Sequence, residues 1–190
     1  EVAAAVDYFE DPSGAPVGRE IEASISAEGR DASFLQVEPV SDEWDRLDEP
    51  FEIRPGIVVP AGEFWNRRHS LELGSSPAAV LSASGGVEWG TFYEGQRETW
   101  TLEVAYRPNP HLLVGLTEDY NDVRLPGGSF STSLLGLRAT WNFSRSLLAS
   151  AYARVNTASD VASLNARLRW MWRPGSDLYL VYNRATGEGL

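Results

Sequence analysis

Few side chains in this 190-residue sequence are placed to do catalytic chemistry. The two histidines, His69 and His111, have no second histidine or carboxylate at the spacing of a zinc site or a catalytic triad. Glu94 and Glu98 flank a short turn, and paired carboxylates can hydrolyse glycosidic bonds, but a hairpin with charged ends explains them more simply. Because cysteine is absent, thiolate chemistry is excluded. We therefore predict a protein that is not an enzyme, with no catalytic residue, metal ligand or cofactor.

Two acidic segments, 42–49 and 118–122, carry oxygen atoms that could bind calcium. Neither has the glycine-punctuated spacing of a defined calcium loop, so we predict solvated loops. The first segment lies inside residues 39–63, which lack a clear strand pattern and are expected to form one long acidic loop. The whole chain, residues 1–190, is expected to form a single domain that includes this loop.

The charges of the chain are unevenly distributed. There are 27 acidic residues and 16 basic ones, every basic residue is arginine, and the net charge is −11. This balance excludes a nucleic-acid partner, since phosphate contacts need a basic face. Residues 1–63 hold 16 of the acids and 4 arginines, whereas residues 129–184 hold 2 acids and 7 arginines. We infer that the two ends of the chain face different surroundings.

The elements that carry these residues follow a period of two along the chain, which indicates β-strands. In Val161–Trp172, apolar residues such as Leu164 and Leu168 alternate with polar ones such as Arg167 and Arg169. Turn signals separate the strands and predict an antiparallel meander of an all-β protein. The expected strands are Glu1–Phe9, Arg19–Ala27, Ala32–Val37, Arg67–Leu73, Ala78–Gly85, Val87–Glu94, Thr99–Arg107, His111–Asn121, Ser131–Phe143, Leu147–Asn156, Val161–Trp172 and Asp177–Asn183.

Alternation fits a soluble sandwich and a membrane barrel equally well. Three features favour the barrel. The strands are about ten residues long, full charges lie in mid-strand, and aromatic residues gather at strand ends as in interfacial girdles. We predict part of an outer-membrane β-barrel. The residues expected to face the lumen are Arg138, Arg154, Arg167, Arg169, Glu103 and Glu88. Those expected to face lipid or form the girdle are Trp100, Tyr106, Trp141, Leu164, Leu168, Trp170 and Trp172.

Several segments resemble one bacterial family. They are Arg173–Asn183 (RPGSDLYLVYN), Gly56–Phe64 (GIVVPAGEF) and Gly90–Gly95 (GTFYEG). They are similar to segments of the membrane-associated, carbohydrate-binding-family-9-like proteins, whose carboxy-terminal domain of unknown function resembles an outer-membrane barrel. The resemblance implies a place in the bacterial outer membrane. The family's amino-terminal sandwich and earlier barrel strands lie outside this sequence, and no aromatic residue ends it. We therefore expect a partial barrel.

The expected activity is passive. The chain would act as a channel for small polar or sugar-derived solutes, or as a membrane anchor, with membrane lipid as its partner. Because membranes do not tolerate open sheet edges, other envelope chains are expected to complete the sheet. Two alternatives remain open. One is a soluble β-sandwich that binds carbohydrate through Trp44, Trp65 and Trp89, and the other is a structural subunit of a larger envelope assembly.

Overall fold

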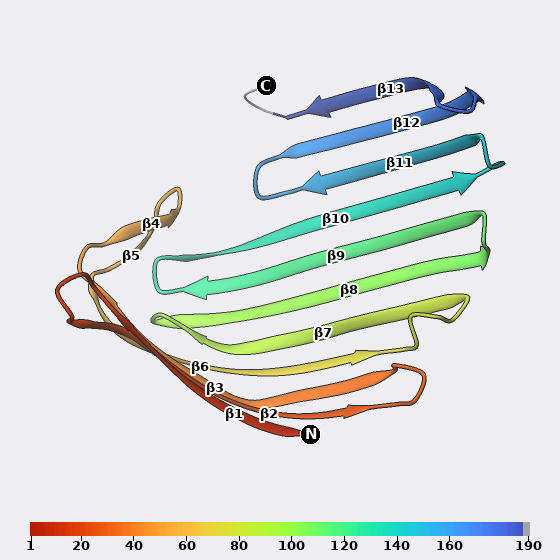
Figure 1. The fold of residues 1–190 in the computed structure, drawn as a ribbon. Helices are drawn as coiled ribbons and strands as arrows, with labels where there is room; N and C mark the ends of the chain where they lie inside the picture. The colour runs from red at the N-terminus through yellow and green to blue at the C-terminus, as the bar shows by residue number, and fades with distance from the viewer. Residues whose placement is uncertain (188–190) are drawn as a thin grey trace. The chain divides into compact units, whose positions relative to one another are not determined.

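A computed structural model describes residues 1–187 as a chain of β-strands without helices (Figure 1). Eleven strands form one antiparallel meander in the order β1-β2-β3-β6-β7-β8-β9-β10-β11-β12-β13, and β4 pairs with β5 in a separate hairpin. The predicted all-β meander is confirmed. The strands are β1 (Val2–Glu10), β2 (Pro16–Glu28), β3 (Phe34–Leu47), β4 (Phe51–Arg54), β5 (Ile57–Val59), β6 (Gly62–Gly74), β7 (Leu81–Phe92), β8 (Gly95–Asn109), β9 (Leu112–Leu125), β10 (Gly128–Asn142), β11 (Leu147–Asn156), β12 (Val161–Arg173) and β13 (Ser176–Thr186).

Closure of the sheet into a barrel is not detected. Strands β1 and β13 each pair with one neighbouring strand, so they are the two edges of the meander within residues 1–187. The same described residues contain no helix long and apolar enough to cross a membrane.

The chain divides into two compact units. Unit 1 contains Glu1–Leu73, Gly86–Trp100 and Asn121–Ser131. Unit 2 contains Gly74–Gly85, Thr101–Tyr120 and Thr132–Leu190, of which the last three residues lie outside the described part.

The core of unit 1 forms around the β4–β5 hairpin. Ile57, Val59 and Phe64 are buried, and the ring of Tyr93 contacts Phe64 edge-on at 5.1 Å between centroids and Phe51 at 5.7 Å. Burial raises the pKa of the Tyr93 hydroxyl above its ordinary value, with a smaller contribution from nearby carboxylates. The hairpin therefore covers one face of the sheet in this unit, on the side of Phe64.

Two sequence expectations were wrong here. The acidic segment 39–63 is not a loop, because most of it belongs to β3, β4, β5 and the start of β6. Its carboxylates are compatible with strands because arginines on neighbouring strands bind them. The expected strands Ala78–Gly85 and Val87–Glu94 are one strand, β7. The glycine at their junction, Gly85, lies against β8, where a Cβ would stand 2.7 Å from the Thr101 carbonyl oxygen.

In unit 2 the register of β10–β13 divides the side chains into two faces. Leu137 pairs with Ala153, Ala153 with Leu164, and Leu168 with Leu180, so the apolar residues form continuous rows across the strands. The apolar face consists of Leu135, Leu137, Ala139, Trp141, Leu147, Ala149, Ala151, Ala153, Val155, Ala162, Leu164, Ala166, Leu168, Trp170, Leu178, Leu180 and Tyr182, and the end of β13 adds two polar residues to it, Arg184 opposite Leu164 and Thr186 opposite Ala162.

The turn between β1 and β2 depends on one carboxylate. Asp11 Oδ1 accepts hydrogen bonds from the backbone N–H of Ser13 (2.8 Å), the Ser13 hydroxyl (2.6 Å) and the backbone N–H of Ala15 (3.0 Å). These bonds, led by that from the Ser13 hydroxyl, hold the pKa of Asp11 below its ordinary value of 3.8.

We predict that the Asp11 turn stabilises the folded chain in a pH-dependent way. Because the pKa is lower in the folded chain, the stabilisation is complete above pH 3.8 and is lost as the pH falls through the folded pKa. Urea unfolding at pH 7 should show Asp11→Ala to be less stable than the wild type, and the difference should shrink towards pH 2. A constant difference at both pH values would contradict this role of the carboxylate.

Candidate functional site

The arginines predicted to share one surface in unit 2 do lie on one face of the sheet. Arg138 pairs with Tyr152, Arg154 with Ser163, and Arg167 with Ser150. By the same register, Arg169 lies on this face, and its guanidinium contacts Asp177 at 3.1 Å. This polar face is the reverse of the apolar one.

Glu103 belongs to the same surroundings as Arg138. Both residues line a hollow of about 280 Å³ in unit 2, together with Arg107 and Tyr152. The Arg138 guanidinium lies 5.5 Å from the Tyr152 ring centroid, and Arg107 donates to the Ser82 hydroxyl at 3.3 Å. The hollow therefore holds two cations and one carboxylate.

The apolar residues predicted to face lipid or form a girdle are found in three settings. Leu164, Leu168, Trp170 and Trp141 share the apolar face of unit 2. Trp100 of unit 1 and Tyr106 of unit 2 are half exposed on β8, and the Trp100 indole donates to Glu98 at 2.6 Å. Trp172 lies where the β12–β13 register shifts, so alternation does not assign it to a face.

Glu88 is placed apart from the unit 2 arginines, in a charged cluster of unit 1. Arg68 is its centre: the guanidinium lies 2.7 Å from Glu43, 3.9 Å from Glu88 and 4.0 Å from Glu20. Arg97 adds a second cation, 2.5 Å from Glu88. Phe64, Asn66 and Arg68 are every second residue of β6, so their side chains share one face of the strand. Arg68 therefore lies on the face that the β4–β5 hairpin covers.

Sequence reasoning missed this cluster. Glu20 and Glu43 are direct cross-strand partners, and two opposed carboxylates repel unless a cation lies between them. Only 16% of the Arg68 side chain is exposed. The available signal in the sequence was that Phe64, Asn66 and Arg68 are every second residue. This period of two begins several residues before the expected start of the strand at Arg67.

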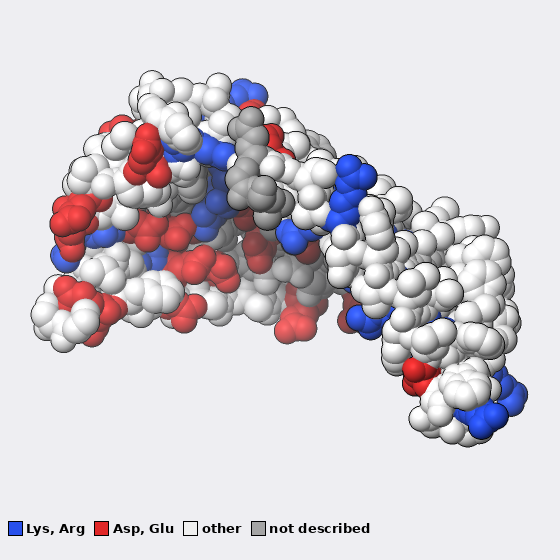
Figure 2. All heavy atoms as spheres, turned by 90° about the horizontal axis from the view of Figure 1, so that it is seen from above, with Lys and Arg blue, Asp and Glu red and all other residues white. Residues whose placement is uncertain are grey.

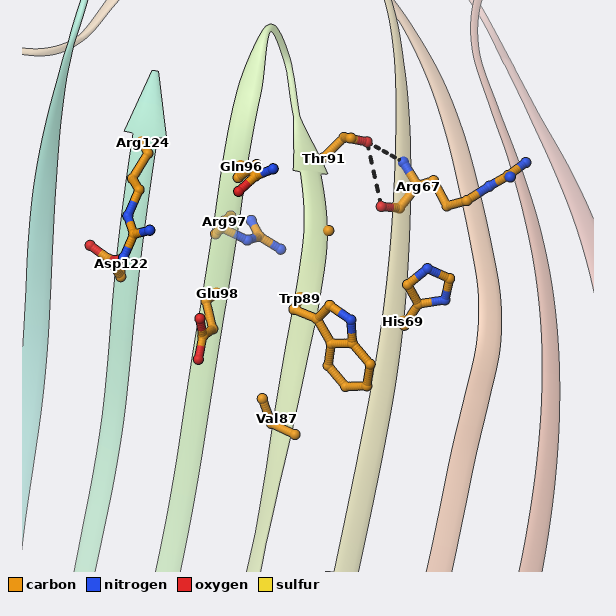
Figure 3. Close-up of a pocket in the computed structure, with 11 residues that line it drawn as sticks. Arg67, His69, Val87, Trp89, Thr91, Gln96, Arg97, Glu98, Asp122 and Arg124 are labelled. Atoms are coloured by element: carbon orange, nitrogen blue, oxygen red, sulfur yellow. Dashed lines mark hydrogen bonds and ion pairs between the residues drawn. The ribbon is translucent and has the colours of Figure 1, made fainter. Parts of the chain in front are cut away.

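The other face of unit 1 carries a hollow of about 490 Å³ formed by β6, β7, β8 and β9 (Figure 3). Trp89 lies between His69 on β6 and Glu98 on β8 (Figure 3). A Cβ at Gly90 would stand 2.0 Å from the Arg67 carbonyl oxygen, so glycine lets β7 approach β6 closely. Thr91 Oγ1 accepts a hydrogen bond from the Arg67 N–H at 2.6 Å.

The residues first considered for catalysis are not brought together. His69 contacts the Pro39 carbonyl and the Trp89 ring, whereas the His111 backbone N–H binds Asn109 in a turn of the other unit. No group of three or more histidine, aspartate or glutamate side chains in residues 1–187 is arranged to hold a metal ion. The acidic residues Asp42 and Glu43 bind Arg67 and Arg68, respectively.

Charged and uncharged surfaces are visibly separate in the space-filling view. Acidic and arginine side chains crowd one part of the visible surface, and another part is almost entirely uncharged (Figure 2).

Comparisons with known proteins add no identification. No protein-family model, no curated protein and no solved structure matches the chain. The resemblance to the carbohydrate-binding-family-9-like proteins therefore stays a prediction.

We predict that Arg68 is essential to unit 1. Arg68→Gln leaves Glu20, Glu43 and Glu88 without their shared cation, and should lower the free energy of unfolding by about 1–3 kcal/mol. Arg124→Gln removes an exposed ion pair with Asp122 and should change the free energy of unfolding by less than about 0.5 kcal/mol. Urea titration of both variants measures the difference. Equal effects would contradict the central role of Arg68.

Proposed function

We propose that this chain forms part of the wall of a β-barrel in a bacterial outer membrane, and acts as a passive channel or a membrane anchor. The observation that carries the proposal is the uncovered apolar face of β10–β13. Leu180 is 69% exposed, Leu178 58%, Trp141 and Trp170 49% each, and Leu137 48%. Exposed apolar surface of this extent marks a surface that meets lipid or another protein.

The reverse face supports a lumen. In a membrane barrel the outward side chains are apolar and the inward ones are polar, and they alternate along each strand. Strands β10–β12 largely follow this rule, with Arg138, Arg154, Arg167 and Arg169 opposite the apolar rows, whereas β13 places Arg184 beside Leu164 and Val181 beside Arg167. Their lengths of 10 to 15 residues match a tilted crossing of the hydrocarbon layer.

The soluble sandwich alternative is less well supported. A sandwich buries the apolar faces of two sheets against each other, about 10 Å apart. Within the described residues there is one large sheet, and the remaining β4–β5 hairpin belongs to unit 1. None of the described residues of unit 2 forms a second layer over the apolar face of β10–β13.

We predict that an arginine on the apolar face weakens membrane association. Leu168→Arg places a charge among apolar side chains, and the expected penalty of about 2–4 kcal/mol at the membrane centre reduces partitioning roughly 30-fold or more. The measurement is co-flotation of the purified chain with phosphatidylcholine vesicles.

Asn165→Arg is the matched control for that experiment. Asn165 lies on the same strand but on the polar face, where its side chain binds Asn183 of β13. This variant should float with vesicles as well as the wild type. If the wild type stays in the aqueous fraction, or if both variants lose flotation equally, the membrane assignment is wrong.

A second prediction concerns the lumen. Arg167→Glu combined with Arg169→Glu reverses the sign of two charges on the polar face, which changes its net charge by about four units. Rings of charge set ion selectivity. In planar bilayers the reversal potential under a salt gradient should shift towards cation selectivity. Unchanged selectivity in a conducting preparation would contradict the lumen assignment, and flotation without conductance would favour the anchor.

A further inference from the structure

The hollow of unit 1 around Trp89 is not used by the proposed function. Its volume of about 490 Å³ falls within the range of roughly 300–1,000 Å³ that is usual for small-molecule sites. The hollow lies on the face opposite to the β4–β5 hairpin. Arg67 and His69, which line it, are the sequence neighbours of Arg68 on β6 and therefore point to the other side of the sheet. The question is which chemistry the hollow fits.

An exposed indole forms one wall of the hollow. Trp89 is 42% exposed, and its ring lies 5.7 Å from the His69 ring, tilted by 40° (Figure 3). The Thr91 hydroxyl, on the same strand and face, is hydrogen-bonded to the backbone of Arg67. An indole held in this way offers an apolar surface for a flat ligand.

Polar groups of both kinds surround this indole. His69 Nδ1 lies 2.5 Å from the Pro39 carbonyl and therefore donates to it, so in the neutral ring Nε2 is a hydrogen-bond acceptor. Glu98 provides carboxylate oxygens, and the exposed amide of Gln96 both donates and accepts. Asp122 and Arg124 complete the set on β9.

The pairing of the arginines argues against an anionic ligand. Arg67 binds Asp42 through two bonds of 2.6 and 2.8 Å, and Arg124 contacts Asp122 at 2.6 Å. Each guanidinium thus has its charge balanced while it keeps further N–H groups. A purely apolar ligand is also excluded, since it would leave these polar groups unpaired.

We propose that the hollow binds a neutral hexopyranose unit, either a free sugar or the head group of a glycolipid. The C–H face of the sugar ring would stack on Trp89, and its hydroxyl groups would exchange hydrogen bonds with Glu98, Gln96 and His69. A hexopyranose combines one apolar ring face with hydroxyls that both donate and accept, which is the combination this hollow presents.

The test uses the full chain in a polyoxyethylene detergent, which contains no sugar, with methyl β-D-glucoside as the probe. Saturation-transfer NMR should detect binding to the wild type. Trp89→Ala should weaken binding about tenfold or more, because the stacking surface is lost. Gln96→Ala removes an exposed amide with little risk to the fold, and should weaken binding by a smaller factor.

Trp141→Ala is the matched control, since Trp141 is a similarly exposed tryptophan in unit 2. It should bind the probe as the wild type does. The proposal is overturned if the wild type gives no saturation transfer, if Trp141→Ala loses binding as much as Trp89→Ala, or if inorganic phosphate competes with the glucoside.

The source of the sugar is decided in a second arm. Phosphatidylcholine vesicles with and without monogalactosyl diacylglycerol are compared, and the shift of the Trp89 indole resonance is measured. A shift that needs the glycolipid assigns a lipid head group. A shift with methyl β-D-glucoside but not with glycolipid vesicles assigns a free sugar.

Discussion

An apolar sheet face has to be removed from water, and this requirement governs unit 2. The rows that run across β10–β13 present leucine, alanine and tryptophan over four strands without a covering layer in that unit. Burial of apolar area contributes about 25 cal/mol per Å² to stability. A face of this kind left in water would not gain that free energy. The arginines on the reverse face are consistent with a sheet whose two sides meet different solvents.

Unit 1 solves a different problem. Its sheet carries two opposed carboxylates, Glu20 and Glu43, which are stabilised by Arg68, and the β4–β5 hairpin supplies buried apolar groups. The Arg68 cluster is a charged sheet surface, whereas the face of β10–β13 described above is mostly apolar. The uneven charge of the sequence therefore corresponds to two kinds of sheet surface, each stabilised by its own contacts.

Much of the fold could be predicted from the sequence, because a period of two is a local property: Leu164, Leu168 and Trp170 fall on one face in any straight strand. The β4–β5 hairpin could not be predicted, since its burial depends on Tyr93, which is distant in sequence and contacts Phe51 of β4. The same holds for Arg68, whose partners come from three other strands. The hollow around Trp89 forms only where β6, β7, β8 and β9 lie side by side, and a local sequence pattern does not predict which residues of the four strands meet.

The order of the meander has a consequence of parity. Neighbouring strands run in opposite directions, so in a row of eleven the first and the last, β1 and β13, run in the same direction (Figure 1). They cannot pair with each other as antiparallel neighbours. An all-antiparallel closed sheet has an even number of strands, so whatever completes this one contributes an odd number. If the sheet closes into the barrel proposed above, two copies related by rotation about its axis would meet in parallel, and are therefore excluded as an all-antiparallel assembly.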